Sequence, residues 1–473
     1  MLPVILIATF MALFDVFVVN VAAPSLQQDL HAGDAALELI VGGYAFCYAS
    51  GLVTGGRLGD LFGYRKLFML GMAGFTIASV LCGVAQNPGE LVASRLLQGV
   101  TAAAMVPQVL ALITSVFPAE ERPRAVSWLG VAIGTGAVAG QLLGGMLLDL
   151  NLFGWGWRPI FLVNLPVGVV ALYFAWRLLP AHRGVARPKL DPLGAVGLSG
   201  ALGLALVPLV LGRTLHWPAW AWVCMALSIP ALALVIWWQR VLTNRGGQPL
   251  MDLTLFQGRI FSAGLAINFA FMAFFSSIML GTTLYLQIGL HLSPLESGLT
   301  FTPMGVINAI ASVSATRFIA RWGGQKVITA GSLIAAFGLV VMLAILWIDG
   351  TSTGAPALIA PLFVMGLGSG LAFPSLIGAV LAGIQPRQAG GAAGILTTTQ
   401  QFASAAGVAV LGSIFFSILG DRPGRGDFDS ALEITVLGGL VLLALASGLT
   451  VLLRPRTATE STRKSVEVPE PVS

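Results

Sequence analysis

Apolar stretches of about 20 residues, the length of helix that crosses the hydrocarbon core of a bilayer, recur along the whole of this 473-residue chain. Only 10% of the residues are charged, whereas soluble domains carry about a quarter. The sequence therefore predicts an all-α polytopic membrane protein with fourteen spans. We delimit these at residues 2–25, 38–58, 67–86, 89–114, 125–148, 158–180, 192–212, 217–239, 259–289, 296–319, 326–348, 356–382, 389–419 and 431–453.

Lysine and arginine are distributed unevenly over the loops between these spans. An even number of spans places both termini on one side of the membrane. Of the 25 basic residues, twenty fall on that side, four fall on the opposite side, and Arg95 lies within a span. Because short cytoplasmic loops carry an excess of basic residues, we expect both termini in the cytoplasm. The net charge of +5 then reflects topology, and no nucleic-acid partner is expected.

An internal repeat relates the two halves of the chain. Residues 26–71 align with residues 286–331 at a constant offset of 260, with eleven identities in 46 positions. Six spans precede residue 180 and six follow residue 259, as in duplicated transporters. We expect a six-helix bundle over 1–180, two extra spans with linkers over 181–258, a second six-helix bundle over 259–453 and a tail over 454–473. The repeat sets Asp15 opposite Phe275 and Asp60 opposite Ala320, which indicates acidic chemistry in the first half only.

Asp15 interrupts the first apolar stretch near the middle of the membrane. Acidic residues at that depth are costly and usually serve transport. Burial and a neighbouring cation have opposite effects on a carboxyl pKa, so a proton and another cation can compete for the group. We interpret Asp15 as a proton-coupling residue. The alternative is a structural hydrogen bond between helices.

Arg95 lies at a similar depth in the fourth span, and it is a candidate partner for a carboxylate such as Asp15. The alternative for Arg95 is that it extends to the outer headgroups. Glu38, at the outer start of the second span, is a candidate second proton relay, with a solvated position at the helix end as the alternative. Gly136, Gly140 and Gly144 line one face of the fifth span, in a spacing that lets two helices approach closely.

The segment GGRLGDLFGYRK, residues 55–66, closes the second span. It closely resembles the loop signature of the major facilitator superfamily, although Leu61 replaces the basic residue that is usual there. The matching residues are Gly56, Leu58, Gly59, Asp60, Gly63, Arg65 and Lys66. An ordinary solvated salt bridge in a loop is the alternative interpretation of these charges.

Three further segments extend the resemblance. LVASRLLQGVTAA (91–103) is similar to the fourth-span signature, and GTGAVAGQLLGG (134–145) resembles the fifth-span antiporter motif with Gln141 in place of its proline. LFDVFVVNVAAPSL (13–26) resembles the first span of the fourteen-helix drug:proton antiporters, the EmrB/QacA subfamily. The two extra central spans fit that branch.

The resemblance implies a proton-coupled multidrug exporter of the bacterial plasma membrane that works by alternating access. It implies a substrate cavity among the first, fourth, ninth and twelfth spans and their neighbours, which favours Asn20, Gln108 and Asn268 among the polar residues within the spans. It also implies gating by the matched residues of two motifs: Gly56, Asp60, Gly63, Arg65 and Lys66, with Gly136, Gly140, Gln141, Gly144 and Gly145.

The carboxylate of Asp60 is predicted to bind the N-terminus of the thirteenth span. Helix N-termini attract anions, and the glycines of Gln388-Ala389-Gly390-Gly391 would let the two backbones approach. This contact would form a latch that holds the cytoplasmic side closed.

Other classes of protein fit the sequence less well. No GxxxxGK[ST] phosphate-binding loop occurs, and the four histidines show no metal-ligand spacing. We therefore expect no enzyme activity, no cofactor and no metal, and a monomer whose partners are protons, small hydrophobic or cationic substrates and the bilayer. Two alternatives remain: an exporter of one endogenous metabolite or antibiotic, and a non-transporting receptor or scaffold on a transporter fold.

Overall fold

In the computed structural model, regular structure over the described residues is helical, and fourteen helices or helix pairs are long and apolar enough to cross a membrane. The described residues are 1–180, 191–212, 215, 217–247, 249–382, 384–385, 388–419 and 424–453, without the side chains of Asn20, Pro24, Asp34, Ala35, Glu38, Phe153, Val210, Leu211 and Pro294. The expected tail 454–473 lies outside them. The helix form satisfies each backbone polar group internally, as a bilayer requires.

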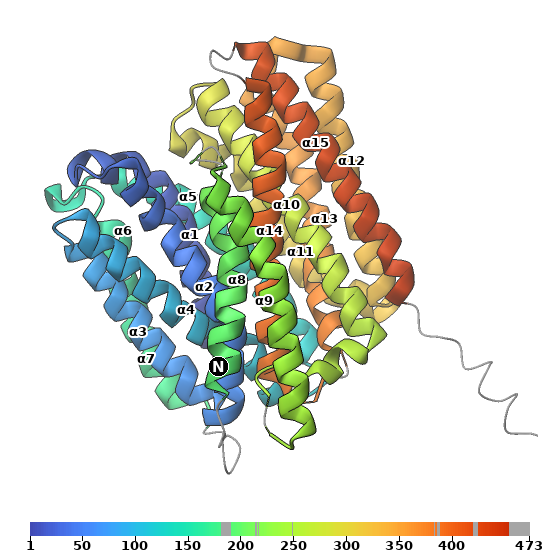
Figure 1. Cartoon of the computed structure of the whole chain (residues 1–473). Coiled ribbons are helices and arrows are strands. Elements are labelled where there is room, and N and C mark those ends of the chain that lie inside the picture. Colours follow the sequence, from blue (N-terminus) through green and yellow to red (C-terminus); the bar gives the residue numbers. More distant parts are fainter. Residues whose placement is uncertain are drawn as a thin grey trace, which may run out of the picture.

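The first half contains seven α-helices and the second half six, with one further pair between them. The first half comprises α1 (Leu2–Asp29), α2 (Asp34–Phe62), α3 (Tyr64–Val84), α4 (Pro88–Val116), α5 (Arg122–Asp149), α6 (Pro159–Leu162) and α7 (Asn164–Leu178). The pair is α8 (Pro192–Leu211) and α9 (Ala219–Asn244). The second half comprises α10 (Arg259–Leu284), α11 (Pro294–Trp322), α12 (Gly324–Asp349), α13 (Ala355–Leu381), α14 (Ala389–Leu419) and α15 (Arg425–Leu449). Within each half the helices pack against one another (Figure 1).

Two helix pairs carry most of the contact between the halves. α5 packs against α11, and α2 packs against α14. The inserted helix α8 contacts both α2 and α14, so it lies along that second seam, with α9 beside it (Figure 1). The proposed domain limits at 180 and 258 are compatible with this packing but stay a prediction.

The backbone repeats the offset of 260 seen in the sequence. His31 and His291 adopt φ values of 50° and 55°, and Gly63 and Gly323 adopt φ values of 97° and 83°. Glycine tolerates positive φ because it has no Cβ. At Gly63 and Gly323 this lets α2 turn directly into α3 and α11 into α12.

The span boundaries differ from the sequence prediction mainly at two places. The sixth span is interrupted at Val163, which separates α6 from α7 and leaves Asn164 as the first residue of the longer piece. The last span begins at Arg425 instead of residue 431. The polar sequence Arg-Gly-Asp-Phe-Asp is predicted as a loop, but it begins α15, where Arg425 donates to the Tyr285 hydroxyl and Asp429 accepts from it.

Candidate functional site

The start of α4 fixes the position of two polar residues. Asn87 precedes Pro88, and its side chain accepts a hydrogen bond from the backbone of Glu90 at 2.9 Å. This cap satisfies a free N–H group and sets where the helix begins. Arg95 and Gln98 then lie one turn apart, on the face of α4 that meets α1.

Asp15 of α1 is held by both of these residues. Arg95 donates to the carboxylate through its terminal nitrogen Nη1, forming an ion pair, and the same nitrogen donates to Oε1 of Gln98 at 2.7 Å. The amide nitrogen of Gln98 donates to the other carboxylate oxygen at 2.8 Å. The exposed fractions are 0% for Asp15, 1% for Arg95 and 0% for Gln98. The predicted partnership of Asp15 and Arg95 is therefore present as a contact.

A second layer of groups surrounds Arg95. Its Nε donates to the backbone oxygen of Ile40 at 2.9 Å, and its guanidinium carbon lies 4.5 Å from the centre of the Tyr44 ring. The Tyr44 hydroxyl donates to the backbone oxygen of Ala12 at 3.3 Å. These contacts hold a cation that has lost its water, and they connect α1, α2 and α4.

Ser79, Asn164 and Cys82 extend the polar network, in which the Cys82 thiol donates to Oε1 of Gln98 at 3.6 Å. The hydroxyl of Ser79 accepts from Gln98 at 2.8 Å and from Asn164 at 3.3 Å. The break before α7 places Asn164 at this depth. Asn164 is one of several polar residues within the spans, and no sequence pattern distinguishes it, Ser79 or Tyr44 from the isolated polar residues that are common in membrane helices.

The network has a clear electrostatic consequence. A buried carboxylate is stable when ionised only if a cation or several donors replace its lost water. In this conformation Arg95 supplies the charge and Gln98 supplies a second donor. A proton or another cation reaching Asp15 would replace Arg95 as the compensating group, so the site can exchange one positive species for another.

Asp60 binds the N-terminus of α14, as the sequence predicts. Its two carboxylate oxygens accept from the backbone N–H groups of Gly390 and Gly391, both at 3.0 Å. Tyr64 donates to the same carboxylate at 2.7 Å, and Arg57 lies 3.8 Å away. We call these groups the Asp60 latch, and the end of the bundle that contains them the Asp60 end.

Glycine is required where α2 meets α14. A Cβ added at Gly56 would lie 2.2 Å from the backbone oxygen of Gly390, and one added at Gly390 would lie 2.4 Å from that of Gly56. Gly63 provides the turn after α2, Arg65 donates to the backbone oxygen of Trp176 at 2.6 Å, and Lys66 is exposed. Arg65 and Lys66 therefore lie outside the Asp60 latch itself.

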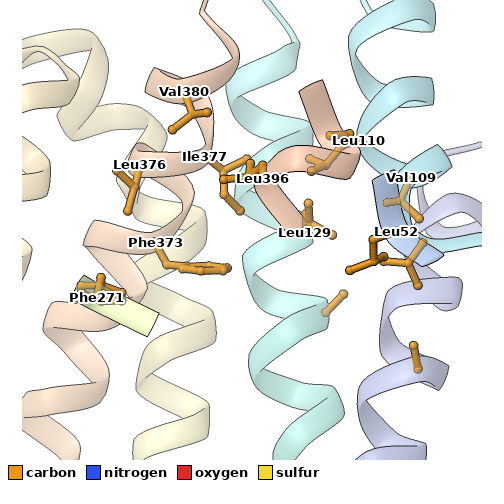
Figure 2. Close-up of a cluster of buried hydrophobic side chains, with 14 of the residues drawn as sticks. Leu52, Val109, Leu110, Leu129, Phe271, Phe373, Leu376, Ile377, Val380 and Leu396 are labelled. Atoms are coloured by element: carbon orange, nitrogen blue, oxygen red, sulfur yellow. The ribbon is translucent and has the colours of Figure 1, made fainter. Parts of the chain in front are cut away.

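The apolar core that both halves share extends to Tyr64 of the Asp60 latch, and we call ten of its residues the apolar plug. The first half contributes Leu52, Val109, Leu110 and Leu129, and the second contributes Phe271, Phe373, Leu376, Ile377, Val380 and Leu396 (Figure 2). Most of these residues lie near the ends of their helices at the Asp60 end. The polar latch and the apolar plug together join the halves at that end.

The glycine face of α5 packs against α1 within the same half. A Cβ added at Gly136 would lie 3.0 Å from the backbone oxygen of Phe10, and one at Gly140 would lie 2.7 Å from that of Phe14. At Gly144 the nearest atom is Cγ2 of Val18, at 2.8 Å. These contacts bracket Asp15 and fix the helix that carries it.

Gly145 and Gln141 have a different neighbour. A Cβ at Gly145 would be 3.6 Å from the backbone of Leu295, and the backbone of Gln141 lies near Gly298. Both residues thus face α11 of the other half, where movement between the halves would change their contacts.

The structure describes the side chains of two of the three residues predicted for the substrate cavity, Gln108 and Asn268. Gln108 is buried and donates to the backbone oxygen of Gly55 at 2.8 Å, which joins α4 to α2. Asn268 is buried, accepts from Gln400 at 3.3 Å, and keeps an amide nitrogen without a partner among the described residues. The side chains of Asn20 and Glu38 lie outside the described part, so their roles stay predictions.

A second buried acidic cluster corrects the expectation that such chemistry is confined to the first half. Asp429 of α15 is 4% exposed and accepts from the Tyr285 hydroxyl at 2.7 Å. Arg425 donates to Tyr285 at 3.2 Å and to the backbone of Thr353. The repeat could not reveal Asp429, because the offset of 260 was applied only to the first-half acids Asp15 and Asp60. Among the described residues, no group of His, Cys, Asp and Glu has the arrangement of a metal site.

The chain is similar in sequence to a known protein family and to several known proteins. The family model of the Major Facilitator Superfamily matches residues 5–192 and 190–408. A protein of Streptomyces coelicolor named "Probable actinorhodin transporter" is 40% identical over 421 residues, which are 89% of this chain and 73% of that protein. The "Puromycin resistance protein pur8" of Streptomyces alboniger is 32% identical, over 95% of this chain and 89% of that one.

Another relative and two solved structures agree with these matches. The "Multidrug resistance protein Stp" of Mycobacterium tuberculosis is 30% identical, over 86% of this chain and 73% of that protein. The human organic anion transporter MFSD10 superposes with a TM-score of 0.64 at 19% identity, covering 93% of this chain and 98% of that one. The proton:xylose symporter XylE superposes with a TM-score of 0.65 at 16% identity, covering 94% of each. At such identities the structures show a shared fold alone.

Proposed function

Because the chain belongs to the major facilitator superfamily, a family of membrane transporters and not of enzymes, we propose that it exports small hydrophobic or cationic compounds in exchange for protons. The relatives named for antibiotic export and for drug resistance support the direction of transport. The fourteen apolar helices fit the fourteen-span branch of drug:proton antiporters. We place the Asp60 end and both termini in the cytoplasm of a bacterium, on the strength of the charge distribution.

The observation that carries proton coupling is the buried contact of Asp15 with Arg95 and Gln98. When Asp15 is ionised, Arg95 neutralises it and α1 is held to α4. When Asp15 takes a proton, the attraction is lost and Arg95 is left to Gln98 and the backbone oxygen of Ile40. A cationic substrate that reaches the carboxylate competes with the proton in the same way.

Movement between two orientations would convert this competition into transport. The Asp60 latch and the apolar plug close the Asp60 end, so this conformation is the one that does not admit substrate from the cytoplasm. Protons that enter down their gradient supply about 2.3 kcal/mol per elementary charge for each 100 mV of membrane potential. Opening of the Asp60 end would then reload the site from inside.

Accumulation of ethidium, a fluorescent permanent cation, tests the proposal in a bacterium that lacks its own drug exporters. Cells that produce the protein should hold several-fold less ethidium than cells without it, and a protonophore should abolish the difference. An equal difference with and without protonophore would contradict proton coupling.

A dedicated exporter of one endogenous compound is the second candidate, because several relatives are named for a single antibiotic. Resistance to a panel of unrelated compounds, including ethidium and puromycin, separates the two. Protection against many of them indicates a multidrug exporter. Protection against one alone indicates a dedicated one.

A further inference from the structure

The linker between α9 and α10 is anchored to the inserted helix pair. Asp191 caps α8 by accepting from the backbone of Gly194 at 2.8 Å, and it also accepts from the side chains of Trp238 at 3.0 Å and Gln239 at 2.7 Å. The other end of the Gln239 amide accepts from the backbone of Met251 at 3.2 Å. Asp191 and Gln239 are both buried, so the start of α8, the end of α9 and Met251 form one fixed unit.

The residue after Met251 extends this unit to the second half. One oxygen of Asp252 accepts from the side chain of Gln388, and the other accepts from the backbone of Thr254 at 3.0 Å and from its hydroxyl at 2.6 Å. Gln388 immediately precedes α14, two and three residues before the glycines whose N–H groups bind Asp60. The contact therefore holds the residue that leads into α14, close in sequence to the two glycines that bind Asp60.

Asp252 is expected to stay ionised, so its contact with Gln388 does not depend on pH. This residue lies between the spans. Partial burial acts to raise its pKa, but the hydrogen bonds from Thr254 and Gln388 and the charge of Arg57 outweigh burial and lower the pKa below its ordinary value. Asp252 thus stays ionised at every pH used for transport, and a pH gradient does not release Gln388. Arg57 acts on both Asp60 and Asp252.

We propose that Asp252 is a positioning residue of the gate: through Gln388 it fastens the N-terminus of α14 to the inserted helix pair, and so keeps Gly390 and Gly391 aligned with Asp60. The inference rests on the proposed gating role of the Asp60 latch. It assigns to α8 and α9 a mechanical task, in addition to their packing along the seam between α2 and α14.

The labelling rate of a cysteine in the apolar plug tests this proposal. Cys47, Cys82 and Cys224 are replaced by serine, cysteine is introduced at Ile377, which is 1% exposed, and a water-soluble maleimide is applied from the Asp60 end. Asp252→Ala and Gln388→Ala should each raise the rate about fivefold, as expected for the loss of one hydrogen bond to a charged group at a half-buried site. The double variant should be no faster than Asp252→Ala alone, because that substitution already removes the contact with Gln388.

Three further variants decide between explanations. Asp252→Glu keeps the charge, and its labelling rate should remain closer to the parent rate than that of Asp252→Ala. Thr254→Val alters the same linker without removing the Gln388 contact, and its labelling rate should stay within about twofold of the parent rate. A rise equal to that of Asp252→Ala would overturn the proposal.

Asp60→Asn tests the gate itself. If Asp60→Asn raises the rate and the Asp252 and Gln388 variants do not, the Asp252 proposal is wrong and the gate stands. If Asp60→Asn has no effect, both fail.

Discussion

Asp15 carries the chemistry in this account, and its environment defines what a substitution would do. Asp15→Asn keeps an oxygen that can accept from Arg95 or Gln98 but removes titration. We expect it to abolish proton-driven ethidium efflux in vesicles. We also expect less folded protein, since removing one partner of a buried ion pair typically costs about 3–5 kcal/mol.

A charge-neutral control separates these two effects. In the double variant Asp15→Asn with Arg95→Gln, no uncompensated cation remains in the site, so the amount of folded protein in the membrane should recover toward the wild-type level. Efflux should stay absent. If either variant still accumulates substrate against a gradient at the wild-type level, Asp15 is not the coupling residue, and Glu38 becomes the acid to test.

At single residues, the sequence was most informative where a group is chemically costly. A carboxylate or guanidinium within an apolar span needs a partner, so Asp15 and Arg95 could be matched by their depth, and Asp60 could be assigned to a helix N-terminus. No partner could be assigned to Ser79, Tyr44 or Asn164, because a hydroxyl or amide group costs little energy at most positions of a membrane helix. Asp252 and Gln388 occur in connecting segments, where no periodic pattern indicates a distant contact.

The contact between α1 and α5 determines where the coupling acid lies. Gly140→Ala places a methyl group 2.7 Å from the backbone oxygen of Phe14, which forces α1 to shift beside Asp15. Gly145→Ala meets nothing nearer than 3.6 Å. We therefore expect Gly140→Ala to reduce ethidium efflux at least tenfold at equal protein level, because a shift of about 1 Å in a functional site can cost a hundredfold.

Gly145→Ala is the matched control for the α1 contact, because Gly145 faces α11 and has room for a methyl group; any loss that comes from its predicted gating role should be smaller than the loss in Gly140→Ala. Equal losses in the two variants would indicate that substitution anywhere on α5 impairs transport, and would contradict a specific role for the α1 contact. The glycine spacing alone indicated close packing of α5, but not which helix it packs against, because several helices of the same half could supply the surface.

For the whole molecule, the charge distribution leads to a topology that can be measured. A reporter enzyme that works only in the cytoplasm should be active when it is fused after residue 187 or at the C-terminus. A reporter that works only outside the membrane should be active when it is inserted beside Gly424. Twenty basic residues lie on the side of the termini and four on the other side, which strongly favours cytoplasmic termini. An external signal from either of the first two fusions would overturn the orientation of the fourteen spans.

The architecture was largely predictable, because apolar length, loop charge and an internal repeat act over hundreds of residues. The sequence predicted all fourteen spans, and the repeat reappears in the backbone at His31 and His291. The sequence did not predict how the inserted helix pair contacts the two halves. α8 packs against both α2 and α14, and it is anchored by Asp191, a residue before the helix that no sequence pattern singles out.

Purified protein in lipid vesicles provides the most direct test of exchange between protons and substrate. Vesicles with an acidic interior are diluted into alkaline buffer that contains ethidium, whose permanent charge prevents passive trapping by pH. We expect wild-type protein to accumulate ethidium above its external concentration only while the pH gradient lasts, and Asp15→Asn to accumulate none. Wild-type accumulation that is the same with and without a pH gradient, or absent for every exported compound, would contradict it.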